Sequence, residues 1–272
     1  MLKPTIQTML AAAKRLWQQP GMLAVFATLY AVLLAMLYAF AMVSEATFAQ
    51  VLLTLLLMLA ASLEFMMLQA AIIDNAQNGA INWPRILRNS LRLAKVTLPV
   101  IIFSVALFLG LNRWESGFAA PSASPQGLHL PALLFSTLRW LLFGITLPLA
   151  TIHLWLHTTG QIGGEKTSIL RRGRTVLSSA FTPASVFTYT IGLVLFALVP
   201  YAILFLQLPL KGARTDFPIL IGRLVLVFLT TLCGWVLTVT ASAQNVVATD
   251  TVDGEDAAVK FKGQVHRRSQ FV

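Results

Sequence analysis

The sequence predicts an all-α membrane protein with six transmembrane helices, arranged as three pseudo-repeats of an amphipathic helix followed by a transmembrane hairpin. Three observations support this fold class. First, the 272 residues are 57% hydrophobic and only 11% charged, whereas a soluble domain carries about 25% charged residues. Second, the apolar residues gather in six long runs, with most of the basic residues on one side of them. Third, a stripe of apolar residues recurs before each odd-numbered run.

Each apolar run is long enough, or nearly so, to cross a hydrocarbon core of about 30 Å. The first run is longer than a signal-peptide core of about 7–15 residues and no small-residue cleavage site follows it, so a retained transmembrane helix is expected there. The third run is the shortest. The runs are Gly21–Val43, Thr47–Ile72, Val96–Leu111, Ala132–Thr158, Pro183–Leu206 and Pro218–Ala241.

The basic residues predict the orientation of the chain in the membrane. Fifteen of the 20 lysines and arginines flank the runs on the side that holds both termini, and only Arg113, Lys211 and Arg214 lie on the other side. Because basic residues concentrate on the cytoplasmic side, both termini are expected in the cytoplasm and the protein in the inner (plasma) membrane. Nucleic acid is not an expected partner, since no basic-aromatic module accompanies the net charge of +10.

The segment before each odd-numbered run has the stripe of an amphipathic helix. Apolar or small residues occupy positions i, i+1, i+4, i+7 and i+8, and position i+4 is small every time. A proline follows each segment (Pro20, Pro99 and Pro183), near where a new helix is expected to begin. The stripes are Met9, Leu10, Ala13, Leu16 and Trp17; Ile86, Leu87, Ser90, Leu93 and Ala94; and Ile169, Leu170, Gly173, Val176 and Leu177.

These stripes divide one helical membrane domain, residues 1–248, into repeats at about 5–74, 82–160 and 165–248. Each repeat is an amphipathic helix, an outward span and an inward span. Residues 249–272 are acidic first and basic later with little apolar periodicity, which predicts a flexible cytoplasmic tail. Among the spans, only the fourth is expected to be interrupted near its middle, by Pro148.

Ionisable residues inside spans are the candidates for a polar intramembrane site, because each is costly to place there. Glu64 is the deepest acid and suits a proton or cation site, or a hydrogen bond that ties helices together. His153 and His157 stand one turn apart on the fourth span, but no third firm metal ligand accompanies them. Arg139 and Arg223 lie near the external ends of their spans, where they snorkel to the interface or face a shared anion-binding cavity. No metal or cofactor is expected.

The basic residues of the amphipathic segments are candidates for contact with anionic lipids of the cytoplasmic leaflet. The alternative is that they serve only as topology signals beside packing elements. The candidates are Lys14, Arg15, Arg88, Arg92, Lys95, Arg171, Arg172 and Arg174.

The segments INWPRILRNSLRLAKVTLP and TSILRRGRTVLSSAFTP resemble those of six-span bacterial integral membrane proteins, including the membrane domain attached to some glycerophosphodiester phosphodiesterases. The resemblance covers about residues 5–248 and implies a stand-alone membrane domain without known catalysis. The phosphodiesterase catalytic domain has no counterpart in this chain, and neither phosphate-binding glycine motifs nor a nucleophile elbow occur.

The sequence therefore favours a non-enzymatic, multi-pass inner-membrane protein that contacts lipid or acts as a scaffold. Its expected partners are the bilayer, anionic lipids on the cytoplasmic side and a membrane-protein partner. The alternative is a small-molecule or ion transporter that uses Glu64, His153, Arg139 and Arg223. A shared, water-accessible cavity lined by these four residues would favour the transporter.

Overall fold

The computed structural model describes residues 2–43, 47–118, 130–159, 169–205 and 213–268, and these form helices without any strand. Six helical segments are long and apolar enough to cross a membrane, in agreement with the six predicted runs. The protein is therefore an all-helical, multi-pass membrane protein. The segments are Pro20–Met42, Phe48–Asn78, Trp83–Gly117, Ala132–Thr159, Pro183–Phe205 and Pro218–Val246.

The helices follow one another in three hairpins. A separate helix precedes the first and the third hairpin, whereas the second begins directly with its long first helix. The first unit comprises α1 (Leu2–Trp17), α2 (Pro20–Met42) and α3 (Phe48–Asn78). The second comprises α4 (Trp83–Phe118), α5 (Leu130–Arg139), the π-helical segment η1 (Trp140–Thr146) and α6 (Leu147–Thr159). The third comprises α7 (Ile169–Ala180), α8 (Pro183–Leu193), the π-helical segment η3 (Val194–Leu198), α9 (Val199–Phe205) and α10 (Ala213–Arg268).

Local sequence signals set several helix ends. Thr47 and Gln50 form a capping box at the start of α3, and Gly79 ends that helix in the left-handed conformation with φ 74°. Pro20 and Pro183 occupy the first helical positions of α2 and α8, as predicted. Pro99, in contrast, lies inside α4, so the expected boundary between amphipathic segment and span is absent there. A proline is tolerated within a membrane helix where neighbouring groups satisfy the carbonyl that it frees.

Two spans contain a π-helical segment just before a proline. In the fourth span η1 ends two residues before Pro148, and in the fifth span η3 ends two residues before Pro200. A proline ring clashes with the carbonyl four residues earlier, and the wider π turn relieves that clash. The interruption at Pro148 agrees with the sequence prediction, whereas the one at Pro200 was not predicted.

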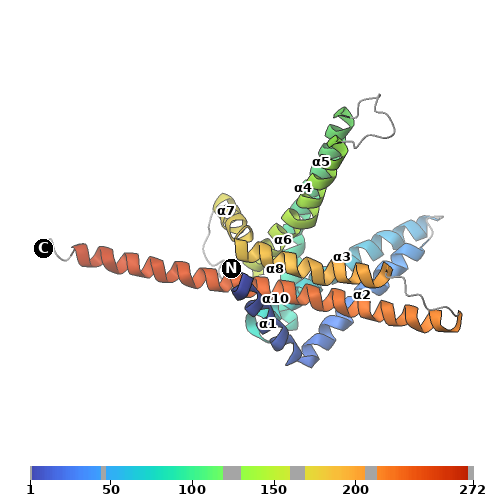
Figure 1. The fold of residues 1–272 in the computed structure, drawn as a ribbon, viewed down its shortest axis with the longest axis horizontal. Coiled ribbons are helices and arrows are strands. Elements are labelled where there is room, and N and C mark those ends of the chain that lie inside the picture. Colours follow the sequence, from blue (N-terminus) through green and yellow to red (C-terminus); the bar gives the residue numbers. More distant parts are fainter. Residues whose placement is uncertain (1, 44–46, 119–129, 160–168, 206–212, 269–272) are drawn as a thin grey trace.

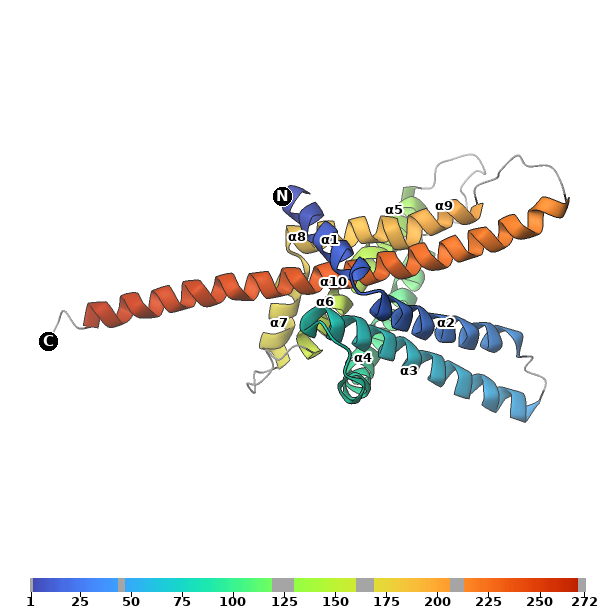
Figure 2. The ribbon, with the colours of Figure 1, turned by 90° about the horizontal axis from the view of Figure 1, so that it is seen from below.

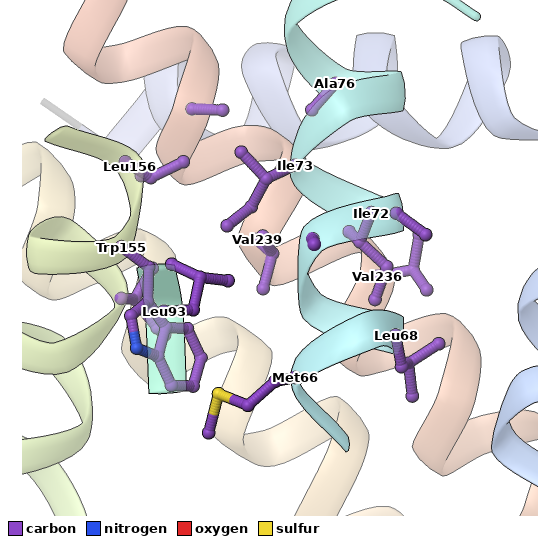
Figure 3. Packing of buried hydrophobic residues seen from close by; sticks show 14 of the residues in the cluster. Met66, Leu68, Ile72, Ile73, Ala76, Leu93, Trp155, Leu156, Val236 and Val239 are labelled. Carbon is purple, nitrogen blue, oxygen red and sulfur yellow. The ribbon is translucent and has the colours of Figure 1, made fainter. Parts of the chain in front are cut away.

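The three hairpins diverge from a shared base that contains α1, α6, α7 and the middle of α10 (Figures 1 and 2). Most of the buried residues lie in the parts of the spans nearest this base, while the distal parts expose many large apolar side chains. Figure 3 shows the apolar core, where α3, α6 and α10 meet. The exposed distal parts fit a hydrocarbon environment, because apolar surface there needs no protein partner.

The last helix, α10, continues as one helix to Arg268, and its C-terminal end projects away from the bundle (Figures 1 and 2). Residues 249–268 are thus helical, although the sequence shows little apolar periodicity there. The helical conformation does not test whether this segment moves, so the flexible tail stays a prediction.

Candidate functional site

A cavity of about 560 Å³ lies between the first and second hairpins. Its volume is within the range of about 300–1,000 Å³ that small-molecule sites occupy. The cavity is partly open and its walls come from α2, α3, α4 and the η1–α6 span, so no single segment of the chain forms it. Its lining is Leu33, Leu37, Phe40, Met58, Ala61, Ser62, Phe65, Met66, Thr97, Val100, Ile101, Ser104, Phe143, Leu147, Pro148 and Thr151.

The cavity contains four hydroxyl groups, and each donates to a carbonyl of its own helix. The acceptors for Ser62 and Thr97 are the carbonyls of Met58 at 2.8 Å and Leu93 at 2.7 Å. Ser104 and Thr151 likewise donate to carbonyls four residues earlier, each at 2.7 Å. Because a hydroxyl has a single hydrogen, these side chains offer the cavity lone pairs but no free donor. The cavity is thus chemically close to hydrocarbon.

The two ends of the cavity differ in exposure. At the end nearest the base, Leu33, Met66 and Thr97 are buried. At the other end Leu37 and Met58 are exposed, at 46% and 59%. The cavity is therefore closed toward the base of the bundle and open toward the far ends of the hairpins.

Trp155 forms the floor behind the closed end. Its indole N–H donates to the Thr97 hydroxyl at 2.8 Å, and its ring meets Phe65 edge to face with centroids 6.0 Å apart. Figure 3 shows the indole beside Leu93, with Met66 nearby. This buried contact joins three helices and holds the shape of the closed end.

A second, smaller cavity of about 250 Å³ lies between the first and third hairpins. Leu33 and Phe65 line both cavities, so only a thin wall separates them. Gln69 and Trp235 line the smaller one, where the indole N–H donates to the Gln69 carbonyl oxygen at 2.8 Å. This cavity is also mostly apolar.

His153 and His157 lie on one face of α6, as their spacing predicts, and both contact Ser179 of α7. The Ser179 hydroxyl is 3.0 Å from His157 Nε2 and 3.3 Å from His153 Nδ1. His153 is completely buried, and its Nε2 has no hydrogen-bond partner among the described residues. The described residues contain no group of three metal-ligating side chains. The histidines therefore join α6 to α7 through one serine.

Arg139 forms a cluster at the far end of the second hairpin. Its guanidinium pairs with Glu115 and donates to the Asn112 side-chain oxygen at 2.6 Å. The Phe108 ring lies with its centroid 6.0 Å from the guanidinium carbon. This cluster joins α4 to the end of α5, so Arg139 has a partner within its own hairpin.

Glu64 and Arg223 are half-buried on α3 and α10. Neither lines a described cavity, and neither do His153 and Arg139. Of the five predicted polar residues, the structure brings together only the two histidines. The cavity-lining residues were not predicted, because each belongs to an ordinary apolar run and only the packing of four helices assembles them.

The candidate lipid-contacting residues at the base of the bundle differ in their surroundings. Arg15 is half-buried and donates to the carbonyls of Asn75 and Ala76 at 3.0 and 3.1 Å, which ties α1 to the C-terminal end of α3. Arg171 and Arg172 belong to α7, but their side chains lie outside the described part of the structure. The exposed group is Lys14, Arg88, Arg92, Lys95 and Arg174.

Comparisons with protein-family models, with curated proteins and with solved structures give no match for this chain.

Proposed function

We propose that the protein is a non-enzymatic, lipid-contacting protein of the inner membrane, with both termini in the cytoplasm. The observation that supports this most directly is the composition of the exposed faces at the base of the bundle. On α1, Leu10, Lys14 and Trp17 share one exposed stripe, and Leu10 and Trp17 are 64% and 82% exposed. Apolar and basic side chains on the same exposed face suit the headgroup region, where both find favourable partners.

The beginning of α4 and the helix α7 repeat this composition. On α4, Leu87 and Leu91 are exposed beside the basic residues at 88, 92 and 95. On α7, Arg174 and Leu177 are exposed, and so is Phe181, which directly follows the helix. Three such segments present exposed basic and apolar groups, a composition that suits an anionic leaflet.

The proposal includes the threefold pseudo-repeat. In the first two segments the residues at stripe positions i and i+7 are buried, namely Met9 with Leu16 and Ile86 with Leu93. In the third segment position i+7, Val176, is buried while its neighbour Leu177 is exposed. Position i+7 is thus buried in all three segments, which supports the repeat. This arrangement, together with the resemblance to six-span bacterial membrane domains, supports a membrane domain built from repeated units.

The transporter alternative has less support. It needs Glu64, His153 and the two span arginines along one water-accessible path. They instead have separate surroundings: the histidine contacts α7, and Arg139 pairs within its own hairpin. This separation favours the lipid-contacting proposal, with a membrane-protein partner as a further expected contact of the exposed faces.

The proposal is tested by replacing Arg88, Arg92 and Lys95 with glutamine. Each basic residue near an anionic surface contributes about 1 kcal/mol, so affinity for phosphatidylglycerol should fall by about a hundredfold. Affinity for phosphatidylcholine should not change. Binding is measured by fluorescence titration of the detergent-solubilised protein with each lipid in labelled form.

The matched control is Arg113→Gln, which removes an exposed charge at the opposite end of the second hairpin. It should leave phosphatidylglycerol binding within twofold of the unaltered protein, since that end is expected to face the external leaflet. Equal affinity of the triple variant and the control for phosphatidylglycerol would remove the support for this proposal.

A further inference from the structure

We infer that the cavity between the first two hairpins binds one hydrocarbon chain of a phospholipid, with the chain entering from the external leaflet and its methyl end at Met66 and Thr97. This site deepens the proposed lipid-contacting function and rests on it, because it takes the chain to be embedded in a bilayer. It concerns the acyl chain within the membrane, whereas the basic stripes at the base concern headgroups.

The size of the cavity favours a slender occupant over a helix of another protein. The cavity of about 560 Å³ is lined by four helical segments, which leave it narrow between the first two hairpins. An α-helix with its side chains is about 10–12 Å wide, whereas an extended hydrocarbon chain is far thinner. A single acyl chain can therefore follow the length of the cavity between its walls.

The chemistry of the lining favours hydrocarbon over a polar solute. None of the described residues that line the cavity is ionisable. All four of its hydroxyl hydrogens are engaged with carbonyls of their own helices, as for Ser62 with Met58 and Ser104 with Val100. A polar ligand would leave its own hydrogen-bonding acceptors without donors, at a cost that an alkyl chain avoids.

The direction of entry follows from the exposure of the lining. Leu37, Met58 and Ile101 are exposed at the open end, at a level of the hairpins where the surrounding medium is lipid. Met66 is 7% exposed at the closed end, where Trp155 and Thr97 block further passage. A chain that enters at the open end therefore stops at this floor.

An acyl chain in the cavity would gain dispersion contacts with the apolar walls. Phe65 and Phe143 line the cavity together with the buried residues Leu33 and Ala61, so such a chain would meet apolar side chains from more than one helix. Surrounding acyl chains are present at high concentration in any bilayer. Binding of one of these chains therefore adds dispersion contacts with the lining at a small free-energy cost.

Native mass spectrometry of the detergent-purified protein tests the site, with dioleoylphosphatidylcholine as the probe. A zwitterionic lipid is chosen so that the basic stripes at the base contribute little. The unaltered protein should retain one phosphatidylcholine per chain. Ser104→Phe places a ring in the cavity and should lower that retention about tenfold.

The matched control is Ala106→Phe. Ala106 is exposed on the same helix two residues away and does not line the cavity, so this ring should leave retention unchanged. Equal retention by both variants, or no phosphatidylcholine on the unaltered protein, would overturn the inference. If the Ser104→Phe variant loses phosphatidylcholine but keeps its affinity for phosphatidylglycerol, the cavity site is distinct from the surface contacts proposed above.

A second measurement needs no substitution and so does not depend on the folding of a variant. The unaltered protein is reconstituted in phosphatidylcholine that carries a diazirine at the end of one acyl chain, then illuminated and mapped by peptide mass spectrometry. Met66, which the protein shields from surrounding lipid, should be labelled alongside the exposed Ile102. Labelling of Ile102 without Met66 would show that no chain end reaches the closed end.

Discussion

The Tyr189 hydroxyl on α8 donates a hydrogen bond of 2.9 Å to the backbone carbonyl of Gly144 in η1. In a regular α-helix this carbonyl would accept from the N–H of residue 148, but residue 148 is proline and has none. The third hairpin thus supplies a donor for a carbonyl that the proline of the second hairpin frees. This relationship fixes the fourth span beside the fifth at the point where the helix widens.

Tyr189→Phe should therefore lower the free energy of unfolding by about 1–2 kcal/mol, because a half-buried carbonyl loses its donor. Thermal unfolding in detergent measures the change. Tyr201→Phe is the control, since Tyr201 is 62% exposed and its loss of a hydroxyl should cost less than about 0.5 kcal/mol. A double variant that adds Pro148→Ala should recover part of the loss, because the restored N–H supplies the donor. Equal effects of the two tyrosine changes would contradict the role of this bond.

Gly234→Ala should destabilise the packing of α10 against η3. A Cβ at Gly234 would lie 2.8 Å from the backbone nitrogen of Phe196, and a backbone atom has no rotamer through which to move away. The helices would have to separate, at a cost of about 1–3 kcal/mol. Gly222→Ala on the same helix meets no atom within 4 Å and should be neutral, or stabilising by up to about 1 kcal/mol. Unfolding in increasing dodecyl sulfate compares the two, and a Gly234 variant as stable as the Gly222 variant would refute the close approach.

Ser179→Ala should weaken the junction between α6 and α7. It removes the hydroxyl that both histidines contact and leaves the buried His153 ring without a described partner on either nitrogen. The expected loss is about 1–3 kcal/mol of stability, with faster hydrogen exchange in α7. Ser178→Ala is a matched control on the neighbouring exposed residue and should change stability by less than about 0.5 kcal/mol. Indistinguishable exchange in the two variants would argue against the histidine junction.

Local patterns were sufficient to locate the spans. The predicted run Ala132–Thr158 differs by one residue from the span Ala132–Thr159, because the length of apolar chain needed to cross a bilayer is a property of the segment itself. The prolines at 20 and 183 begin helices as predicted. The prediction for Pro99 was wrong: α4 continues through it, since a proline starts a new helix only where the chain also turns.

The candidate site was only partly predictable. The spacing of His153 and His157 correctly placed both on one face of a helix. Their shared partner Ser179 lies 22 residues beyond His157, and no local pattern marks it. Glu64 and Arg139 were grouped with them as ionisable residues inside spans, but a place within a span does not determine which way a side chain points around its helix. The roles of the basic residues as lipid contacts stay predictions.

The amino-acid sequence alone predicts a helical chain with six apolar segments long enough to cross a membrane, and fifteen of its 20 basic residues lie on one side of them. Hydrophobic length and charge distribution act on each segment independently, so they can be read one segment at a time. The divergence of the hairpins, the partly open apolar cavity between four helices and its closure by Trp155 are visible only in the folded structure. Membrane helices associate through shape and hydrogen bonds rather than through hydrophobicity, because every apolar face exposed to lipid is equally hydrophobic.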